Sequence, residues 1–181
     1  MKKTSLLLVS SLMILSFPAF SAEQKAIRPV KDNYISDNAN TSKYKNLNII
    51  DVLTQLKMFN TYLSALKQAG LTEMFKGKGG YYTVFAPNDK AFAKIPKASL
   101  DKLMKDKVAL RKLLLFHLVS GTEMSKDIVK KKNVKTVEGS MLKISQKGKR
   151  ILINDSDFLN GDIKTKNGVI HIIDTVLPFI K

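Results

Sequence analysis

Ten consecutive residues predict a strand, the end of that strand and the beginning of a helix: Thr83-Val84-Phe85-Ala86-Pro87-Asn88-Asp89-Lys90-Ala91-Phe92. The β-branched and aromatic side chains at the beginning favour a strand. Pro87 has no N–H to give to a neighbouring strand and therefore ends it. Asn88 or Asp89 can then accept a hydrogen bond at the start of a short helix, on which Phe92 is expected to face the core. We interpret five of these residues as structural: Thr83, Phe85, Pro87, Asp89 and Phe92.

A second stretch, near the C-terminus, predicts a turn and a buried strand: Asn167-Gly168-Val169-Ile170-His171-Ile172-Ile173-Asp174. The Asn-Gly pair tolerates positive φ at both positions and is typical of a type I′ turn. The residues after it are apolar on both faces, so the strand is expected to lie in the middle of a sheet. Asp174 is expected to cap or tether the last turn of the chain. A structural role is again predicted, for Asn167, Gly168, His171 and Asp174.

The order of the remaining elements predicts an α+β fold. Residues 48–70 and 99–116 repeat apolar side chains at helical spacing. After Gly121 the spacing changes to two, or to short apolar runs, at residues 134–137, 141–145, 150–154 and 169–173, with hairpin-type connections between them. Helices first and strands later are typical of an α+β domain rather than of alternating βαβ units.

Taken together, these blocks resemble the fasciclin domain family. Phe116-His117 resembles the Tyr-His motif of the family, and Asp162-Ile163 stands where adhesive members carry an Asp-Ile pair. The resemblance spans about Asn46 to Pro178. It implies one domain, at residues 46–181, in which a wedge of β-strands packs against a helical cluster. It also implies a secreted adhesion or binding module that recognises a cell-surface or matrix macromolecule, without catalysis and without a cofactor.

The resemblance also implies a candidate ligand site made of Asp162, Ile163, Phe116 and His117. Peptides around these two motifs are credited with integrin binding in animal members of the family. Phe116 lacks the hydroxyl of the family's tyrosine. In the functional interpretation Asp162 faces a partner's metal ion or lysine, and Ile163 is exposed beside it. In the alternative interpretation Asn160-Gly161-Asp162 is simply a turn.

His117 and His171 are the only histidines, and each lies among apolar neighbours. A metal site completed by Asp174 or Glu123 is conceivable, but zinc requires three or four ligands at close distance. No local His-x-x-His spacing supports it. Buried polar groups in proteins are normally hydrogen-bonded, so we interpret both histidines as buried and structural.

The chain is strongly basic, with a net charge of +16, of which +14 remains without Lys2 and Lys3. Only three of the basic residues are arginines, and lysine suits many diffuse contacts better than a few shaped ones. We expect acidic polysaccharide or lipopolysaccharide as the alternative partner, or a merely solvated surface. Specific nucleic-acid binding is not expected, because no aromatic residues alternate with the clusters. The densest clusters, and candidate polyanion-binding residues, are Lys130, Lys131, Lys132, Lys147, Lys149 and Arg150.

The N-terminus is typical of an export signal. Two lysines precede an apolar run from Leu6 to Phe20, and Ala19 and Ser21 fit cleavage after Ser21. We predict a signal peptide at residues 1–21, a flexible leader at 22–45, and a secreted or periplasmic location. The chain contains no cysteine, so it lacks the residue by which a lipoprotein is anchored. No transmembrane helix is expected in the mature form, and the oligomeric state is left open.

The sequence lacks the motifs of common enzyme classes, such as Gly-x-Ser-x-Gly or His-Glu-x-x-His. Scattered Asp and Glu residues leave one alternative from a different class, an envelope-glycan hydrolase with two carboxyl groups about 5 to 10 Å apart. A deep pocket with two facing carboxylates would favour the hydrolase. A lysine patch on a convex surface would favour a binding module.

Overall fold

The computed structural model describes residues 42–178. The predicted signal peptide and most of the predicted leader lie outside the described residues. The fold begins slightly before the predicted boundary at residue 46, because Tyr44 is buried. The part of the chain that the structure describes contains no helix long and apolar enough to cross a membrane.

The N-terminal half of this part is mainly helical, as the apolar spacing predicted. Asn48 caps the first α-helix by accepting a hydrogen bond from the backbone N–H of Asp51 at 3.0 Å. Gly70, with φ 68°, follows the end of the second, where the left-handed conformation favours glycine. The helices are η1 (Ser42–Tyr44), α1 (Ile49–Gln55), α2 (Asn60–Gln68), η2 (Met74–Lys78), α3 (Asp89–Ala93), α4 (Lys97–Lys105), α5 (Lys107–Phe116) and α6 (Ser125–Ile128).

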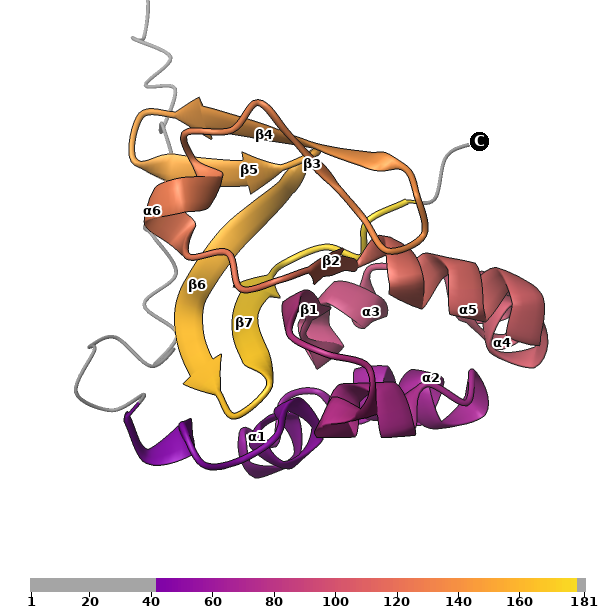
Figure 1. Ribbon diagram of the computed structural model, residues 1–181. Helices are drawn as coiled ribbons and strands as arrows, with labels where there is room; N and C mark the ends of the chain where they lie inside the picture. Colours follow the sequence, from indigo (N-terminus) through magenta and orange to yellow (C-terminus); the bar gives the residue numbers. More distant parts are fainter. Residues whose placement is uncertain (1–41, 179–181) are drawn as a thin grey trace, which may run out of the picture. The chain divides into compact units, whose positions relative to one another are not determined.

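The strands form one sheet with the order β2-β1-β7-β6-β5-β4-β3. Among the strand pairs of residues 42–178, only β1 and β7 are parallel. A bridge between Val119 and Thr136 links the two ends of the sheet, so the sheet is nearly a closed barrel (Figure 1). The strands are β1 (Tyr82–Pro87), β2 (Leu118–Ser120), β3 (Asn133–Lys135), β4 (Met141–Lys147), β5 (Arg150–Ile153), β6 (Ser156–Thr165) and β7 (Gly168–Ile173).

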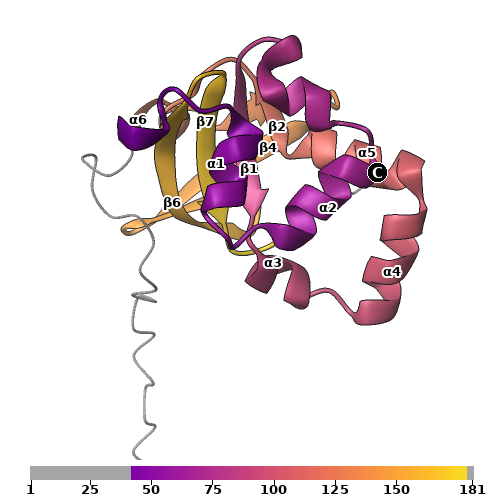
Figure 2. The ribbon, with the colours of Figure 1, turned by 90° about the horizontal axis from the view of Figure 1, so that it is seen from below.

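The central strands β1 and β7 separate two hydrophobic cores. On one face, Val84 and Ile170 pack with the helices, and α1 and α2 lie across this side of the sheet in Figure 2. On the other face, Phe85 and Ile173 pack inside the barrel with side chains from β3, β4 and β5. Successive residues of a strand point to opposite faces, so a strand between two cores must be apolar throughout. The predicted central position of the strand after Gly168 is therefore confirmed.

The prediction of a type I′ turn at Asn167-Gly168 is wrong. The turn lies at Lys166 and Asn167, and Gly168 is the first residue of β7. Its positive φ serves a close approach of strands, since a Cβ at Gly168 would collide with the carbonyl oxygen of Tyr82 on β1. The buried Asn167 amide accepts from the N–H of Ile49 at 3.0 Å and donates to the carbonyl of Phe75 at 2.9 Å. It thereby joins the turn to the helical layer.

The predicted turn at Asn160-Gly161-Asp162 is also wrong, because these residues lie within the ten-residue strand β6. The register against β7 shifts twice here, between Phe158 and Asn160 and between Asn160 and Ile163. Asp162 has φ 60°. An irregularity of this kind bends a strand and re-aims a side chain, which is why turn-forming residues occur inside it.

Candidate functional site

The Asp-Ile pair, for which a recognition tip and a simple turn were the two alternatives, is part of the scaffold. Ile163 is fully buried in the core on the helical side, so the expectation that it is exposed is wrong. Asp162 accepts hydrogen bonds from the backbone N–H and the hydroxyl of Ser125, at 2.7 and 2.6 Å. Its carboxylate therefore holds the start of α6, whose own N-cap residue makes no side-chain hydrogen bond.

The Phe-His pair is buried as well. Phe116 is 5% exposed and packs inside the barrel, and His117 is fully buried. Nδ1 of His117 lies 2.8 Å from the carbonyl oxygen of Leu113, and Nε2 accepts from the N–H of Leu177 at 2.9 Å. Burial lowers the pKa of His117 to about 4, although the hydrogen bond to Leu113 opposes this shift. The neutral imidazole ties α5 to the C-terminal segment.

His171 has a similar structural position inside the barrel. Its ring lies between those of Phe85 and Phe158, at centroid distances of 5.5 and 5.1 Å. Nδ1 accepts from the N–H of Asp162 at 3.1 Å, and Nε2 donates to the carbonyl of Glu123 at 2.8 Å. Burial lowers the pKa of His171 despite the hydrogen bond to Glu123 and the charge of Asp162. Among residues 42–178 no three His, Cys, Asp or Glu side chains are grouped to hold a metal.

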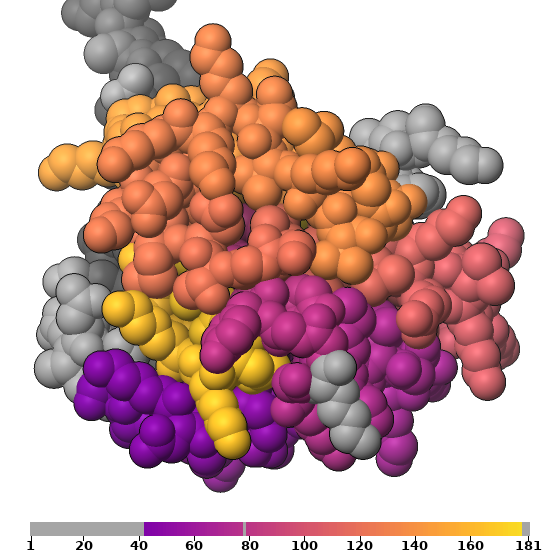
Figure 3. Space-filling model, in the orientation of Figure 1, coloured from indigo at the N-terminus to yellow at the C-terminus, as the bar shows by residue number. Residues whose placement is uncertain are grey.

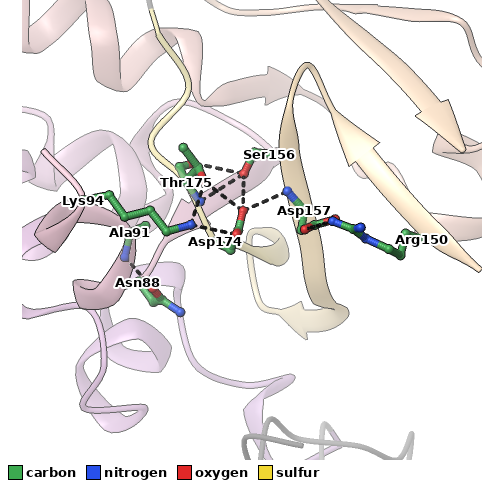
Figure 4. A network of polar contacts seen from close by, with 8 residues as sticks. All are labelled: Asn88, Ala91, Lys94, Arg150, Ser156, Asp157, Asp174 and Thr175. Atoms are coloured by element: carbon green, nitrogen blue, oxygen red, sulfur yellow. Dashed lines mark hydrogen bonds and ion pairs between the residues drawn. The ribbon is translucent and has the colours of Figure 1, made fainter. Parts of the chain in front are cut away.

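Asp174 tethers the end of the last strand, as predicted. Figure 4 shows its carboxylate accepting from the N–H of Asp157 at 2.8 Å, from the hydroxyl of Ser156 at 3.2 Å, and from Nζ of Lys94 at 2.8 Å. Burial raises the pKa of Asp174, but the hydrogen bonds from Lys94, Thr175 and Asp157 outweigh burial and lower it. The carboxylate joins the residue that follows α3, the start of β6 and the C-terminal segment.

Asn88 and Asp89, the two candidate caps of the short helix, act on different helices. Asn88 caps α3, on which Asp89 is the first residue. The Asp89 carboxylate instead caps α2, accepting from the backbone N–H groups of Asn60 and Thr61 at 3.2 and 2.8 Å. Burial raises the pKa of Asp89, but the hydrogen bonds from Thr61 and Asn60 outweigh it and lower the pKa. The carboxylate thus connects two helices.

The basic clusters lie on the surface, and several of their charges are already neutralised. Lys131 pairs with Glu123 at 2.6 Å, and Lys130 lies 3.9 Å from Asp127. Arg150 donates through Nε and Nη2 to the carboxylate of Asp157. Within residues 42–178 we find no ion pair for the exposed lysines Lys132, Lys147 and Lys149.

Sequence reasoning missed Lys135 and Lys143, which lie between the two predicted clusters. Val134, Leu142 and Ile144 alternate with them and face the core, so the lysines face solvent. The alternation that predicts these strands also indicates that each lysine faces solvent, but it does not show that the two lie close together. Segment 121–150 contains nine basic and three acidic residues, a net charge of +6. Its atoms, orange in Figure 3, cover the upper part of the visible face.

Two of the hollows in the described part of the chain lie in the helical layer, and neither resembles a glycosidase site. One, of about 490 Å³ between α3 and α4, contains the carboxylate of Asp89. The other, of about 380 Å³ between α4 and α5, contains that of Asp106. Each is lined by a single acidic residue, and each carboxylate caps a helix, since Asp106 accepts from the N–H groups of Val108 and Ala109. The hydrolase alternative requires two facing carboxylates, which neither of these two hollows provides.

Comparison with known proteins agrees with this architecture. Residues 57–179 match the family described as Fasciclin domain. The chain is 32% identical over 130 residues to protein sll1735 of Synechocystis, covering 72% of this chain and 96% of that one. It is 37% identical over 119 residues to human periostin, covering 64% of this chain and 14% of periostin. This chain therefore corresponds to a small part of periostin.

A solved structure is similar in fold. The FAS1 domain pair from the insect cell adhesion molecule fasciclin I superimposes with a TM-score of 0.64 at 20% sequence identity, over 74% of this chain and 51% of that one. The similar part includes both the helices and the nearly closed sheet. By the sequence match and by the fold, this chain belongs to the fasciclin domain family.

Proposed function

We propose that this chain is an exported, non-catalytic adhesion module that binds an acidic polymer at the cell surface. The observation that carries the proposal is the basic surface of residues 121–150, where exposed lysines outnumber the acids available to pair with them. Lysine-rich surfaces attract polyanions at moderate ionic strength. The insect cell adhesion molecule with a similar fold supports a role in adhesion.

The burial of the Phe-His and Asp-Ile residues favours binding through surface charge over binding through these two motifs. Phe116, His117 and Ile163 are at most 5% exposed, so a partner cannot reach them unless the domain rearranges. Asp162 is occupied by Ser125. The remaining candidates for contact are the surface lysines, and these favour an acidic polysaccharide or lipopolysaccharide over a protein that reads the Asp-Ile pair.

Heparin and lipopolysaccharide binding, measured across a salt series, tests this function. The Debye length falls from about 10 Å at 0.1 M salt to about 3 Å at 1 M, so binding should collapse over this range. Asp162→Asn is the matched control, because asparagine tolerates the positive φ of this position while the charge is lost. Its affinity should equal that of the wild type. Binding that resists salt and is lost in Asp162→Asn would reject the charge-based function and restore the Asp-Ile site.

The proposed export has its own test. Mass spectrometry of the protein purified from its native cells should find a chain that begins at Ala22. A cytoplasmic protein that still begins at Met1 would contradict both the export and a role at the cell surface.

A further inference from the structure

We infer that a linear acidic polysaccharide lies along strands β3 and β4, on a row formed by Lys135, Lys143 and Lys147. This inference rests on the proposed function and gives it a location and a class of ligand. The three residues, called here the lysine row, come from two strands that lie side by side in the upper part of Figure 1.

The register of the sheet places the three lysines on one face. Lys135 lies opposite Met141, and Met141, Lys143 and Lys147 are separated by even numbers of residues on β4. Directly opposite residues share a face, as do residues two apart on one strand. Leu142 and Ile144 point to the other face, into the barrel core. Packing from beneath therefore holds the backbone at Lys135 and Lys143, whereas at the end of β4 both Gln146 and Lys147 are exposed.

The spacing of the row suits an extended ligand. At about 3.3 Å per residue, Lys143 and Lys147 are about 13 Å apart along β4. Lys135 is displaced from Lys143 by about 7 Å along the sheet and by one strand spacing of about 4.8 Å across it. A single phosphate or sulfate group cannot span these distances, whereas a chain that carries charges at intervals can contact all three lysines.

The charges of the row are available to a ligand. Within the described residues, none of the three side chains has an ion pair or a hydrogen bond to a carboxylate. The acid in the β3–β4 turn, Glu138, accepts instead from the hydroxyl of Ser140 at 2.6 Å. This distinguishes the row from Lys130, Lys131 and Arg150, which face acidic partners.

The side chain between the charges favours a sugar polymer. Met141 is 57% exposed. It lies directly opposite Lys135 on the neighbouring strand, and it is two residues from Lys143 on its own strand. An acidic polysaccharide has both anionic groups and apolar C–H faces on its rings, so it can contact lysines and a methionine together. Single-stranded nucleic acid is normally bound with aromatic side chains that stack on bases, and the exposed face of β3 and β4 has none.

Two triple variants test the row with the same loss of charge. One is Lys135→Gln, Lys143→Gln and Lys147→Gln. The control is Lys97→Gln, Lys102→Gln and Lys105→Gln, which changes three exposed lysines on α4. The probes are heparin fragments of increasing length, inositol hexakisphosphate as a compact polyanion, and a single-stranded DNA oligomer. Thermal unfolding of each variant verifies that it is folded.

The row predicts a specific pattern of affinities. The row variant should bind long heparin fragments about tenfold more weakly at 0.1 M salt, and the slope of log affinity against log salt should fall by about 2 to 3. The control should stay within about threefold of the wild type, because distant charges are screened. Affinity should rise with fragment length, and inositol hexakisphosphate should bind weakly to all three proteins.

Other outcomes separate failure of the row from failure of the function. Equal losses in both variants would overturn the row while leaving a diffuse basic surface as the binding site. Tighter binding of the DNA oligomer than of heparin with a similar number of charges would overturn the choice of polysaccharide. A wild-type protein that binds no heparin at 0.05 M salt would overturn the proposed function together with the row.

Discussion

Replacing Asp89 with alanine should destabilise the domain through a helix that is far away in the sequence. The carboxylate accepts from the backbone N–H groups of Asn60 and Thr61 at the start of α2, and from the Asn60 side chain at 2.9 Å. Phe59, the N-cap residue of α2, provides no side-chain hydrogen bond. Asp89→Ala therefore leaves two helix N–H groups without their acceptor.

The expected loss in the free energy of unfolding follows from the hydrogen bonds that Asp89→Ala removes. Removing an N-cap acceptor costs about 0.5 to 2 kcal/mol, and removing a negative charge near a helix N-terminus costs about 0.3 to 1 kcal/mol. Asp89 is partly exposed, and water screens the charge, so we expect about 1 to 2.5 kcal/mol in total. Asp89→Asn keeps one oxygen acceptor and should lose about half as much. Asp101→Ala, on the exposed face of α4, should change stability by less than about 0.5 kcal/mol.

Urea unfolding at several pH values measures this effect. Because the pKa of Asp89 is lowered in the folded state, the stabilisation is fully present above the unfolded pKa of about 3.9 and is lost as pH falls through the folded pKa. The difference between wild type and Asp89→Ala should be constant from neutral pH to about 5 and shrink below about 4. An unfolding midpoint of Asp89→Ala equal to that of wild type at pH 7 would refute the proposed link between α3 and α2.

Three further predictions concern buried or structural side chains. Phe92→Ala should cost about 3 to 5 kcal/mol, because the ring is 1% exposed in the core on the helical side; an unchanged unfolding midpoint would contradict this packing. Burial lowers the pKa of His117 to about 4, below its value in the unfolded chain. As pH falls, the unfolded chain therefore takes up a proton on this histidine before the folded protein does. The free energy of unfolding should fall by about 3 kcal/mol between about pH 6.5 and 4. His117→Gln should be less stable at pH 7 and should show a flatter decline; a decline as steep as that of the wild type would assign the effect to other groups. Asp162→Asn should lower the free energy of unfolding by about 1 to 2 kcal/mol, because the charged acceptor at the start of α6 is replaced by a neutral one. Its heparin affinity should stay unchanged. Calorimetry and heparin titration of the same sample measure the two quantities, and a loss of heparin affinity together with stability would contradict the prediction.

Local sequence signals predicted the elements that depend on neighbouring residues. The strand, proline stop and Asn88-capped helix at residues 83–92 occur as expected, because capping and strand ends are decided over a few residues. The burial of His117 and His171 was likewise indicated by their apolar neighbours. The residues of β7 are apolar on both faces of the strand, and this pattern correctly predicted its central position in the sheet.

The errors concern contacts between distant segments. The local sequence offers Asn88 and Asp89 alike as the cap of α3; Asn88 has that role, whereas the partners of Asp89 lie 28 and 29 residues away. Neither interpretation of Asp162, contact with a partner or a turn, includes its bond to Ser125, because nothing in the local sequence shows that α6 requires its carboxylate. Residues that favour turns were interpreted as a turn at Asn160–Asp162, whereas pairing with β7 extends the strand through them.

The lysine row was missed for the same reason. Lys135 and Lys143 are eight residues apart and join no run of basic residues. They become neighbours only through the register that sets Lys135 opposite Met141. Strand register is determined by the buried faces of both strands, so a charge pattern across two strands is not visible in the order of residues alone.

Lysine footprinting tests most directly the central claim that exposed lysines of the sheet, and not the buried motif residues, bind an acidic polymer. The protein is treated with an acetylating reagent at 0.1 M salt, with and without heparin, and modification at each lysine is measured by mass spectrometry. We predict that heparin protects Lys135, Lys143 and Lys147 and leaves Lys97, Lys102 and Lys105 on α4 fully reactive. Equal protection of both sets, or protection that persists at 1 M salt, would contradict the account.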